Sequence, residues 1–245
     1  MGPVLYCGDP HGRFDHIIEA ALRTNASAVV LLGDLEPKRA LHEDLDPIRE
    51  RVWWIPGNHD ADSDDLCMRV SGSGLADRNV HGRVVTLPDG TQLAGLGGIF
   101  RESVWHPSEG AARGGKPAFR SRDEHAASTP PHRRWRGGHE RMHWGTIYSD
   151  EVDRLSELQA NVLVTHEAPG YHPYGFDLLD TLAQSMGVRA LVHGHRHDRL
   201  DSSAFWGLQG FASIWGWASW HHSGLSLSGL QARPCRGGAK GRTGR

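Results

Sequence analysis

The stretch VLYCGDPH, residues 4–11, joins a run of four apolar residues directly to a glycine, an aspartate and a histidine. Continuous apolar runs of this length are typical of strands buried on both faces. Four more runs follow the same plan: AVVLL (28–32), VWWI (52–55), VLVT (162–165) and ALVH (190–193). In open α/β sheets, the carboxyl ends of the strands form a common site. We therefore expect the residues that follow these runs to converge.

The residues that follow the five runs can bind metal ions. They are Asp9, His11, Asp34, Asn58, His59, Asp60, His166, His195 and His197. The Asp9/His11 and His195/His197 pairs have a spacing of two, which lets both side chains of a pair face one site. Glycines precede Asp9, Asp34, Asn58 and His195, where the backbone must turn sharply or approach closely.

Helical patterns lie between several of the runs. We expect helices over FDHIIEAALR (14–23), over SDEVDRLSEL (149–158) with Ser149 as the N-cap, and from about Phe176 to Met186, ending at Gly187. Strands that alternate with helices indicate an α/β fold with a mainly parallel sheet. The segment 83–98 predicts a hairpin and 205–230 predicts further β-structure, so we also expect a second sheet of antiparallel strands.

The composition is that of an ordinary globular protein, with 245 residues, 38% of them hydrophobic and 23% charged. The net charge of −2 argues against a dedicated nucleic-acid binder. We expect one domain over 1–232 and a basic, disordered tail over 233–245. Three distant cysteines, no signal-peptide pattern and no long apolar run predict a cytoplasmic protein.

Residues 101–148 interrupt the pattern as an irregular basic insertion. Residues 101–145 contain nine Arg or Lys against five acidic residues, and five histidines, without a clear period. A long loop of this kind inside a domain is commonly a functional lid or a flexible insertion. Its positive charge suits an anionic ligand, although a solvated loop can carry the same charge.

Taken in order, the motifs DxH, GD, GNHD, TH and GHxH resemble those of the calcineurin-like metallophosphoesterases. The resemblance runs from Asp9 to His197 and implies a four-layer α/β/β/α sandwich of two mixed β-sheets flanked by helices. It also implies a dinuclear metal site at the carboxyl ends of the strands. By motif, one ion is held by Asp9, His11 and His197, the other by Asn58, His166 and His195, and Asp34 bridges them.

The resemblance implies a hydrolase in which a metal-bridging hydroxide attacks a phosphate ester. It also implies that His59 faces the leaving group as general acid or electrostatic stabiliser, with Asp60 orienting its ring. The nitrogen and oxygen ligands suit Mn, Fe, Zn, Co or Ni, and we favour Mn. We expect a phosphomonoesterase acting on a phosphorylated small molecule, nucleotide or phosphoprotein, with no membrane partner. The alternative is a phosphodiesterase or nuclease acting on nucleotides or nucleic acid.

Substrate contacts are less well defined by the motifs. The GDxVDRG motif of related Ser/Thr protein phosphatases is replaced by GDLEPKR (33–39), so their phosphate-binding arginine has no counterpart here. We expect Arg101 to supply that contact, with Arg133, Arg134 and Arg136 as alternatives. Tyr171, His172 and Tyr174, in the segment after His166, are expected to form a substrate wall, although Tyr and His also pack ordinary loops.

Two other functions remain as alternatives. HERMH (139–143) matches the HExxH motif of zinc proteases, which requires both histidines on one face of a helix. A metal-free scaffold with the same fold is the other, and it predicts missing ligands, whereas all seven positions are filled. His193, the first histidine of HGHRH, completes neither ligand set, and we predict a structural role for it.

Overall fold

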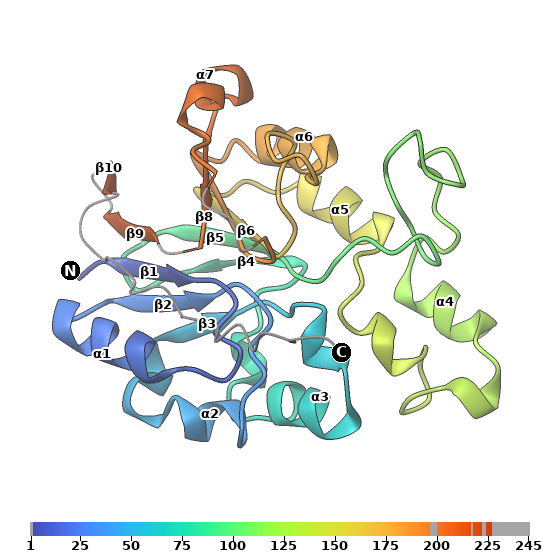
Figure 1. The fold of residues 1–245 in the computed structure, drawn as a ribbon, viewed down its shortest axis with the longest axis horizontal. Coiled ribbons are helices and arrows are strands. Elements are labelled where there is room, and N and C mark those ends of the chain that lie inside the picture. Colours follow the sequence, from blue (N-terminus) through green and yellow to red (C-terminus); the bar gives the residue numbers. More distant parts are fainter. Residues whose placement is uncertain (1, 197–199, 217, 222–223, 227–245) are drawn as a thin grey trace, which may run out of the picture.

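In a computed structural model of the protein, two five-stranded sheets pack face to face, and helices cover their outer sides (Figure 1). The structure describes residues 2–196, 200–216, 218–221 and 224–226. The strands are β1 (Val4–Cys7), β2 (Ala28–Leu31), β3 (Val52–Trp54), β4 (Arg83–Thr86), β5 (Gln92–Leu96), β6 (Val162–Thr165), β7 (Ala190–His193), β8 (Ala212–Trp215), β9 (Ala218–His221) and β10 (Gly224–Ser226). The helices are α1 (Asp15–Thr24), α2 (Leu41–Asp44), α3 (Asp64–Ser71), α4 (Arg122–Ser128), α5 (Ser149–Ser156), α6 (Asp177–Ser185) and α7 (Trp206–Gln209).

Both sheets are mixed. The first has the order β10-β9-β1-β2-β3, with β1, β2 and β3 parallel and the other two strands antiparallel to their neighbours. The second has the order β4-β5-β6-β7-β8, in which only β4 runs against its neighbour. The expectation of an antiparallel second sheet was therefore wrong, because β5 of the predicted hairpin also pairs in parallel with β6. The α/β/β/α architecture implied by the resemblance is confirmed.

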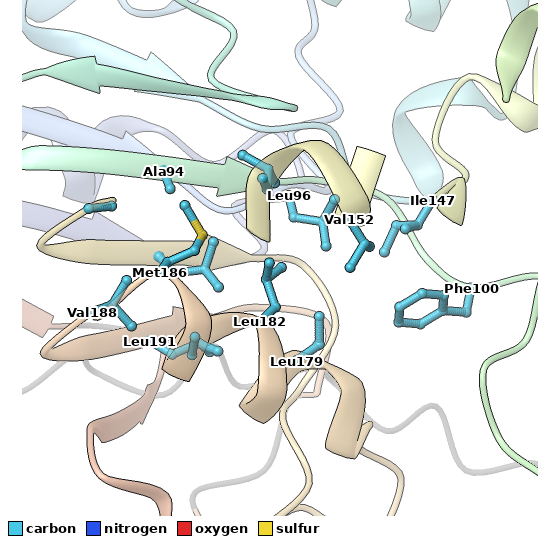
Figure 2. Packing of buried hydrophobic residues seen from close by; sticks show 14 of the residues in the cluster. Ala94, Leu96, Phe100, Ile147, Val152, Leu179, Leu182, Met186, Val188 and Leu191 are labelled. Atoms are coloured by element: carbon cyan, nitrogen blue, oxygen red, sulfur yellow. The ribbon is translucent and has the colours of Figure 1, made fainter. Parts of the chain in front are cut away.

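The strands formed by the continuous apolar runs bury side chains on both faces of their sheet. In β1, Val4 and Tyr6 face the core between the sheets, whereas Leu5 and Cys7 face the helices below the first sheet. A third core lies between the second sheet and helices α5 and α6 (Figure 2). Strands β1, β2, β6 and β7 are buried along their whole length, so their sequences lack the alternating pattern of a half-exposed strand.

The predicted helices occur with small differences at their ends. Helix α5 begins at Ser149, but its N-cap is Tyr148, whose N–H donates to the Glu151 carboxylate over 3.0 Å. The prediction of Ser149 as the cap was therefore one residue late. Gly187 follows α6 with a positive φ of 64°, as expected for a residue that ends a helix. Helix α7 precedes β8 in a segment expected to be β-structure.

The insertion contains a helix that the sequence pattern did not predict. Helix α4 is capped by Ser121, whose hydroxyl accepts the Glu124 N–H over 3.1 Å. Arg122 at its start donates to the buried Glu151 carboxylate over 2.7 Å and to backbone carbonyls of the insertion. These contacts fix the insertion to α5. The predicted tail, 233–245, lies outside the described residues, and the domain limits remain a prediction.

Three histidine rings pack together inside the insertion. The His125 and His143 ring centroids lie 4.6 Å apart, and His139 lies 5.8 Å from His125. Burial lowers the pKa of each ring, that of His143 to about 4. The folded insertion therefore favours neutral imidazoles.

We expect this cluster to make the protein less stable as the pH falls from about 6.5 to about 4. In that range the unfolded chain binds a proton at His143 that the folded chain excludes. Between pH 7.5 and 5.5, wild type should lose about 1 kcal/mol more unfolding free energy than His143→Asn, measured by urea denaturation. Identical losses in the two proteins would contradict the assignment.

Candidate metal centre

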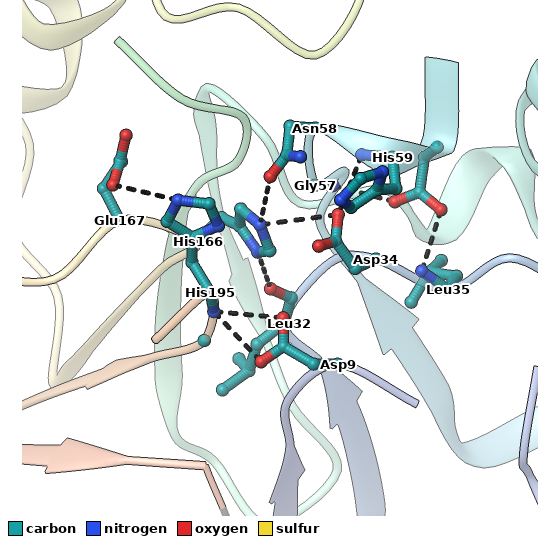
Figure 3. A network of polar contacts seen from close by, with 12 residues as sticks. Asp9, Leu32, Asp34, Leu35, Gly57, Asn58, His59, His166, Glu167 and His195 are labelled. Atoms are coloured by element: carbon teal, nitrogen blue, oxygen red, sulfur yellow. Dashed lines mark hydrogen bonds and ion pairs between the residues drawn. The ribbon is translucent and has the colours of Figure 1, made fainter. Parts of the chain in front are cut away.

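Five strand ends deliver polar side chains to one place, where the two sheets meet (Figure 3). Asp9 follows β1, Asp34 follows β2, Asn58 follows β3, His166 follows β6, and His195 follows β7. The predicted ligand His197 lies outside the described residues. The convergence expected from the five apolar runs is therefore present for the described part of the set.

Asp34 belongs to two groups of residues that could each hold a metal ion. One group is Asp34, His166 and His195, and the other is Asp9, His11 and Asp34. Within each group, one ligand atom per residue lies within 4.8 Å of the others. A carboxylate that belongs to both groups is near the ligand atoms of each, which is where a bridging ligand would be needed.

The His166 ring has one nitrogen available for a cation. Its Nδ1 lies 2.7 Å from the Leu32 carbonyl, which only accepts, so Nδ1 must carry a proton. Its Nε2 faces two further oxygens, Asn58 Oδ1 at 3.1 Å and Asp34 Oδ1 at 3.5 Å. If the ring is neutral, Nε2 has no proton, and its lone pair points at two oxygens that also carry lone pairs, which is unfavourable. A cation between these atoms removes the conflict, and a divalent metal fits the nitrogen and oxygen donors present.

The pKa values in this centre follow from the same contacts. Burial by itself lowers the pKa of His166, but the hydrogen bond and charge of Asp34 raise it to about 9. Burial likewise favours protonation of Asp34, yet His166 and the His59 N–H, 2.9 Å from Oδ1, hold its pKa far below the usual range. The two groups thus stabilise each other's charged forms, and a proton on His166 or a bound metal ion would supply the positive charge next to Asp34.

Four of the predicted ligands have left-handed backbone conformations. Their φ values are 49° at Asp9, 44° at His11, 51° at Asp34 and 64° at His195. Such conformations are uncommon for residues other than glycine and cost about 1–3 kcal/mol each, so they cluster at functional sites. The buried strands that precede these residues hold the strained turns in place.

Two glycines allow the strand ends to approach one another. A Cβ on Gly33 would overlap Nδ1 of His166, and a Cβ on Gly57 would overlap Oδ1 of Asp34. Close packing therefore requires glycine at positions 33 and 57, as the sequence pattern indicated, whereas a Cβ on Gly8 would make only ordinary contacts.

The structure corrects the predicted role of Asp60. This buried carboxylate accepts backbone N–H groups from Leu35, Glu36 and Gly57 at 2.8, 3.2 and 2.8 Å. The His59 ring instead bonds through Nδ1 to Asp62, 2.7 Å away, and this hydrogen bond raises the pKa of His59. Asp60 thus fixes the loop, whereas Asp62 orients the ring.

Two carboxylates at the site were missed from sequence. Glu36 lies 2.5 Å from His11 Nδ1, and Glu167 is buried next to His166, where burial raises its pKa to about 7. Glu36 stands two residues after Asp34, a spacing that could have suggested it. Glu167 directly follows a predicted ligand, but no motif distinguished it from a surface glutamate.

Arg101 lies at the edge of the centre. Its Nε donates to Thr146 Oγ1 over 3.1 Å, and the neighbouring Gly145 packs against the backbone of Gly57 and Asn58. The alternative arginines make local contacts within the insertion: Arg133 pairs with Glu140, Arg134 donates to Thr129 O, and Arg136 lies over the Trp135 ring. The structure therefore favours Arg101 among the candidates.

Tyr171 and His172, expected in a substrate wall, both contact neighbouring groups of the protein, and the wall itself stays a prediction. His172 is buried, and its Nδ1 accepts the Tyr174 N–H over 3.1 Å. The Tyr171 hydroxyl lies 2.7 Å from Nε2 of His193. These contacts fold the loop after β6 on itself, and of this loop Tyr174 is the strongly exposed ring.

His193 differs from the histidine that follows it. It is fully buried at the end of β7, with Nε2 facing the Tyr171 hydroxyl and Nδ1 3.1 Å from the Gly194 carbonyl. Neither metal group includes it. Its position agrees with the predicted structural role.

HERMH does not form a protease site in the part of the chain that the structure describes. His139 precedes a short 3₁₀ turn (Arg141–His143) that ends at the second histidine, so the two do not share a face of an α-helix. Nδ1 of His139 lies 2.8 Å from the Glu140 carbonyl. Among the described residues, candidate metal groups occur only at the strand ends. The match to HExxH is therefore incidental.

Comparison with known proteins identifies the class. The profile described as calcineurin-like phosphoesterase matches residues 2–199, and the chain belongs to this family. It is therefore a hydrolase that acts on phosphate esters, and its family implies divalent metal ions.

Individual relatives add fold information. The chain is 36% identical over 197 residues to an uncharacterized protein of Haemophilus influenzae, covering 80% of this chain and 83% of the relative. A crystal structure of TT1561 from Thermus thermophilus aligns with a TM-score of 0.51 at 17% identity, over 87% of both chains. At that identity, the second match supports the fold alone.

Among the described helices, none has both the length and the apolar character of a membrane-spanning helix.

Metal content distinguishes the two buried histidines at neighbouring strand ends. We expect His166→Ala to weaken metal binding by about 100-fold or more, since it removes a nitrogen ligand, and His193→Ala to change it by less than about tenfold. Mass spectrometry of protein dialysed against limiting metal gives the comparison. Equal metal loss in both variants would show that His193 is a ligand.

Proposed function

We propose that the protein is a metal-dependent phosphatase that hydrolyses phosphomonoesters, with two divalent ions held at the strand ends. The observation that carries the proposal is the Asp34 carboxylate, shared between two groups of potential ligands. Asp9, His11 and His197 would hold one ion, and Asn58, His166 and His195 the other. When bound, such a pair lowers the pKa of a water and offsets charge on the phosphoryl oxygens.

Manganese is the favoured metal, with Fe, Zn, Co and Ni as alternatives. Imidazole nitrogens and carboxylate and amide oxygens suit these ions, and the set contains no thiolate. Cys7, the cysteine nearest in sequence to Asp9, points into the apolar core between the first sheet and its helices. The donor set alone does not distinguish the five metals.

His59 is suited to protonate the leaving-group oxygen. Its ring centroid lies 6.2 Å from that of His11, which places it beside the centre, and about half of its side chain is exposed. Asp62 holds Nδ1, so Nε2 is the nitrogen that can reach a substrate. This arrangement supports a proton donor at the rim of the site.

Arg101 favours a monoester over a diester. The terminal nitrogens of its guanidinium make no hydrogen bond within the described residues, while its Nε is held by Thr146. A phosphomonoester dianion has one more charged terminal oxygen than a diester and gains more from such a group. A phosphodiesterase acting on nucleotides or nucleic acid is the alternative, and the exposed Tyr174 ring, on which a base could stack, supports it.

Two chromogenic esters test the proposal. Protein loaded with manganese should hydrolyse p-nitrophenyl phosphate at least about tenfold more efficiently than the bis ester. The monoester preference should fall in Arg101→Gln, because the variant loses the extra charge. Hydrolysis of the bis ester alone would replace the phosphatase by the diesterase, and inactivity with all five metals would support the scaffold.

Aryl phosphates of different leaving-group pKa test the role of His59. We expect His59→Ala to lose about 100-fold in kcat with the poorest leaving group and much less with the best, because only the former needs a proton. Asp62→Asn should show the same trend more weakly, whereas Asp46→Asn, an exposed carboxylate that pairs with Arg49, should have no effect. Equal losses of kcat for all leaving groups in His59→Ala would exclude the proton-donor role.

A further inference from the structure

Glu167 is a buried carboxylate beside the candidate metal centre whose charge is incompletely paired. Its Oε1 accepts the Phe100 N–H over 3.3 Å, but Oε2 makes no hydrogen bond. The residue is 3% exposed, so water does not solvate this oxygen. A buried carboxylate is costly unless cations lie nearby.

Two positively charged or protonatable groups approach Oε2 from the loop after β7. Arg196 Nη2 lies 3.8 Å away and His195 Nε2 lies 3.9 Å away. Since His195 belongs to a candidate ligand group, Arg196 is the permanent cation of the two. Glu167, in the loop after β6, thus contacts both Phe100, the residue before the insertion, and the loop that carries Arg196.

The Arg196 guanidinium is held by weak contacts and retains unused donors. It lies over the Tyr174 ring, 5.3 Å from the centroid, and its Nη2 reaches the Tyr174 carbonyl at 3.4 Å. Its Nε is buried without a hydrogen-bond partner, and 30% of the side chain is exposed. An arginine with unsatisfied donors is suited to bind an anionic oxygen group.

Arg196 lies on a different side of the site from His59, because its partner Glu167 and His59 stand on opposite sides of His166 and Asp34 (Figure 3). Arg196 directly follows His195, on the side of the site lined by Tyr174, which is 69% exposed. Arg101, bonded to Thr146, lies near enough to interact with the charges of both Asp62 and Glu167, so it stands between the His59 side and the Glu167 side of the site. A group bound at Arg196 would therefore be a part of the substrate other than the leaving-group oxygen that faces His59.

We propose that Arg196 binds a second anionic group of the substrate, a phosphate or a carboxylate, and that Glu167 positions Arg196 for this contact. The inference rests on the proposed phosphatase function and specifies its substrate class. The substrate would be a small phosphomonoester with a second anionic group, and Tyr174 would cover one side of that group.

A matched series of substrates tests the proposal. Propanediol monophosphate, propanediol bisphosphate and phosphorylated hydroxypropionate share a chain that ends in a hydroxyl, a phosphate or a carboxylate. For wild type loaded with manganese, we expect the two substrates with a second anion to have a KM about 10–100-fold lower than the hydroxyl-ended one, with similar kcat. Comparison of the two anionic substrates determines which anion the site prefers.

Variants identify the residues responsible. Arg196→Gln should raise KM about 10–100-fold for the substrates with a second anion and change the hydroxyl-ended substrate by less than about threefold. Arg196→Lys should recover part of the loss, because it keeps the charge. Glu167→Gln, which retains the shape of the side chain, should show the same selective rise in KM at smaller size. Arg154→Gln, which removes a cation paired with Asp150 on the surface of α5, is the matched control and should behave as wild type.

The outcomes separate this inference from the proposed function. Hydrolysis of the hydroxyl-ended substrate by Arg196→Gln at the wild-type rate shows that the variant is folded and active. Equal losses on all three substrates, or no preference in wild type, would overturn the role of Arg196 and leave the phosphatase intact. A wild-type protein inactive on every monoester would overturn both.

Discussion

The Asp34 carboxylate connects the two sheets at the point where their strands end. It follows β2 of the first sheet, and its Oδ1 lies 3.5 Å from Nε2 of His166, which follows β6 of the second. The same oxygen accepts the His59 N–H, so the loop after β3 is fixed to it as well. His166 Nε2 thus faces both this buried carboxylate and the Asn58 amide oxygen, and a positive charge at that nitrogen, from a proton or a bound metal ion, stabilises the arrangement.

This close approach depends on the backbone more than on the side chains. Gly33 and Gly57 permit contacts that any Cβ would block, and four candidate ligands have positive φ. Such conformations persist only where the surrounding structure holds them. Here that structure is a set of short strands buried on both faces, so the apolar runs and the polar turns form one functional unit. The family membership agrees with this unit, since its profile covers residues 2–199.

Much of this could be predicted from sequence because the relevant signals are local. The apolar runs predicted the central strands, and the residues after them predicted which side chains converge. Contacts between distant segments had no such signal. Asp60 and Asp62 are equivalent carboxylates in sequence, and only the loop geometry shows that Asp62 holds the His59 ring. Glu167 and Arg196 meet through two loops and could not be paired from their positions in the chain. The resemblance implied that the second sheet is mixed, whereas the residue pattern alone predicted antiparallel strands, because the parallel pairing of β5 with β6 spans the whole insertion.

The number of metal ions bound by Asp34→Asn tests the central claim most directly. If the carboxylate is shared, wild type dialysed with manganese should contain about two ions per chain and Asp34→Asn fewer than about one, because both groups lose a charged ligand. Asn58→Ala, which removes a ligand from only the proposed set of Asn58, His166 and His195, should retain about one ion. A count of one in wild type, or two in Asp34→Asn, would contradict the shared carboxylate.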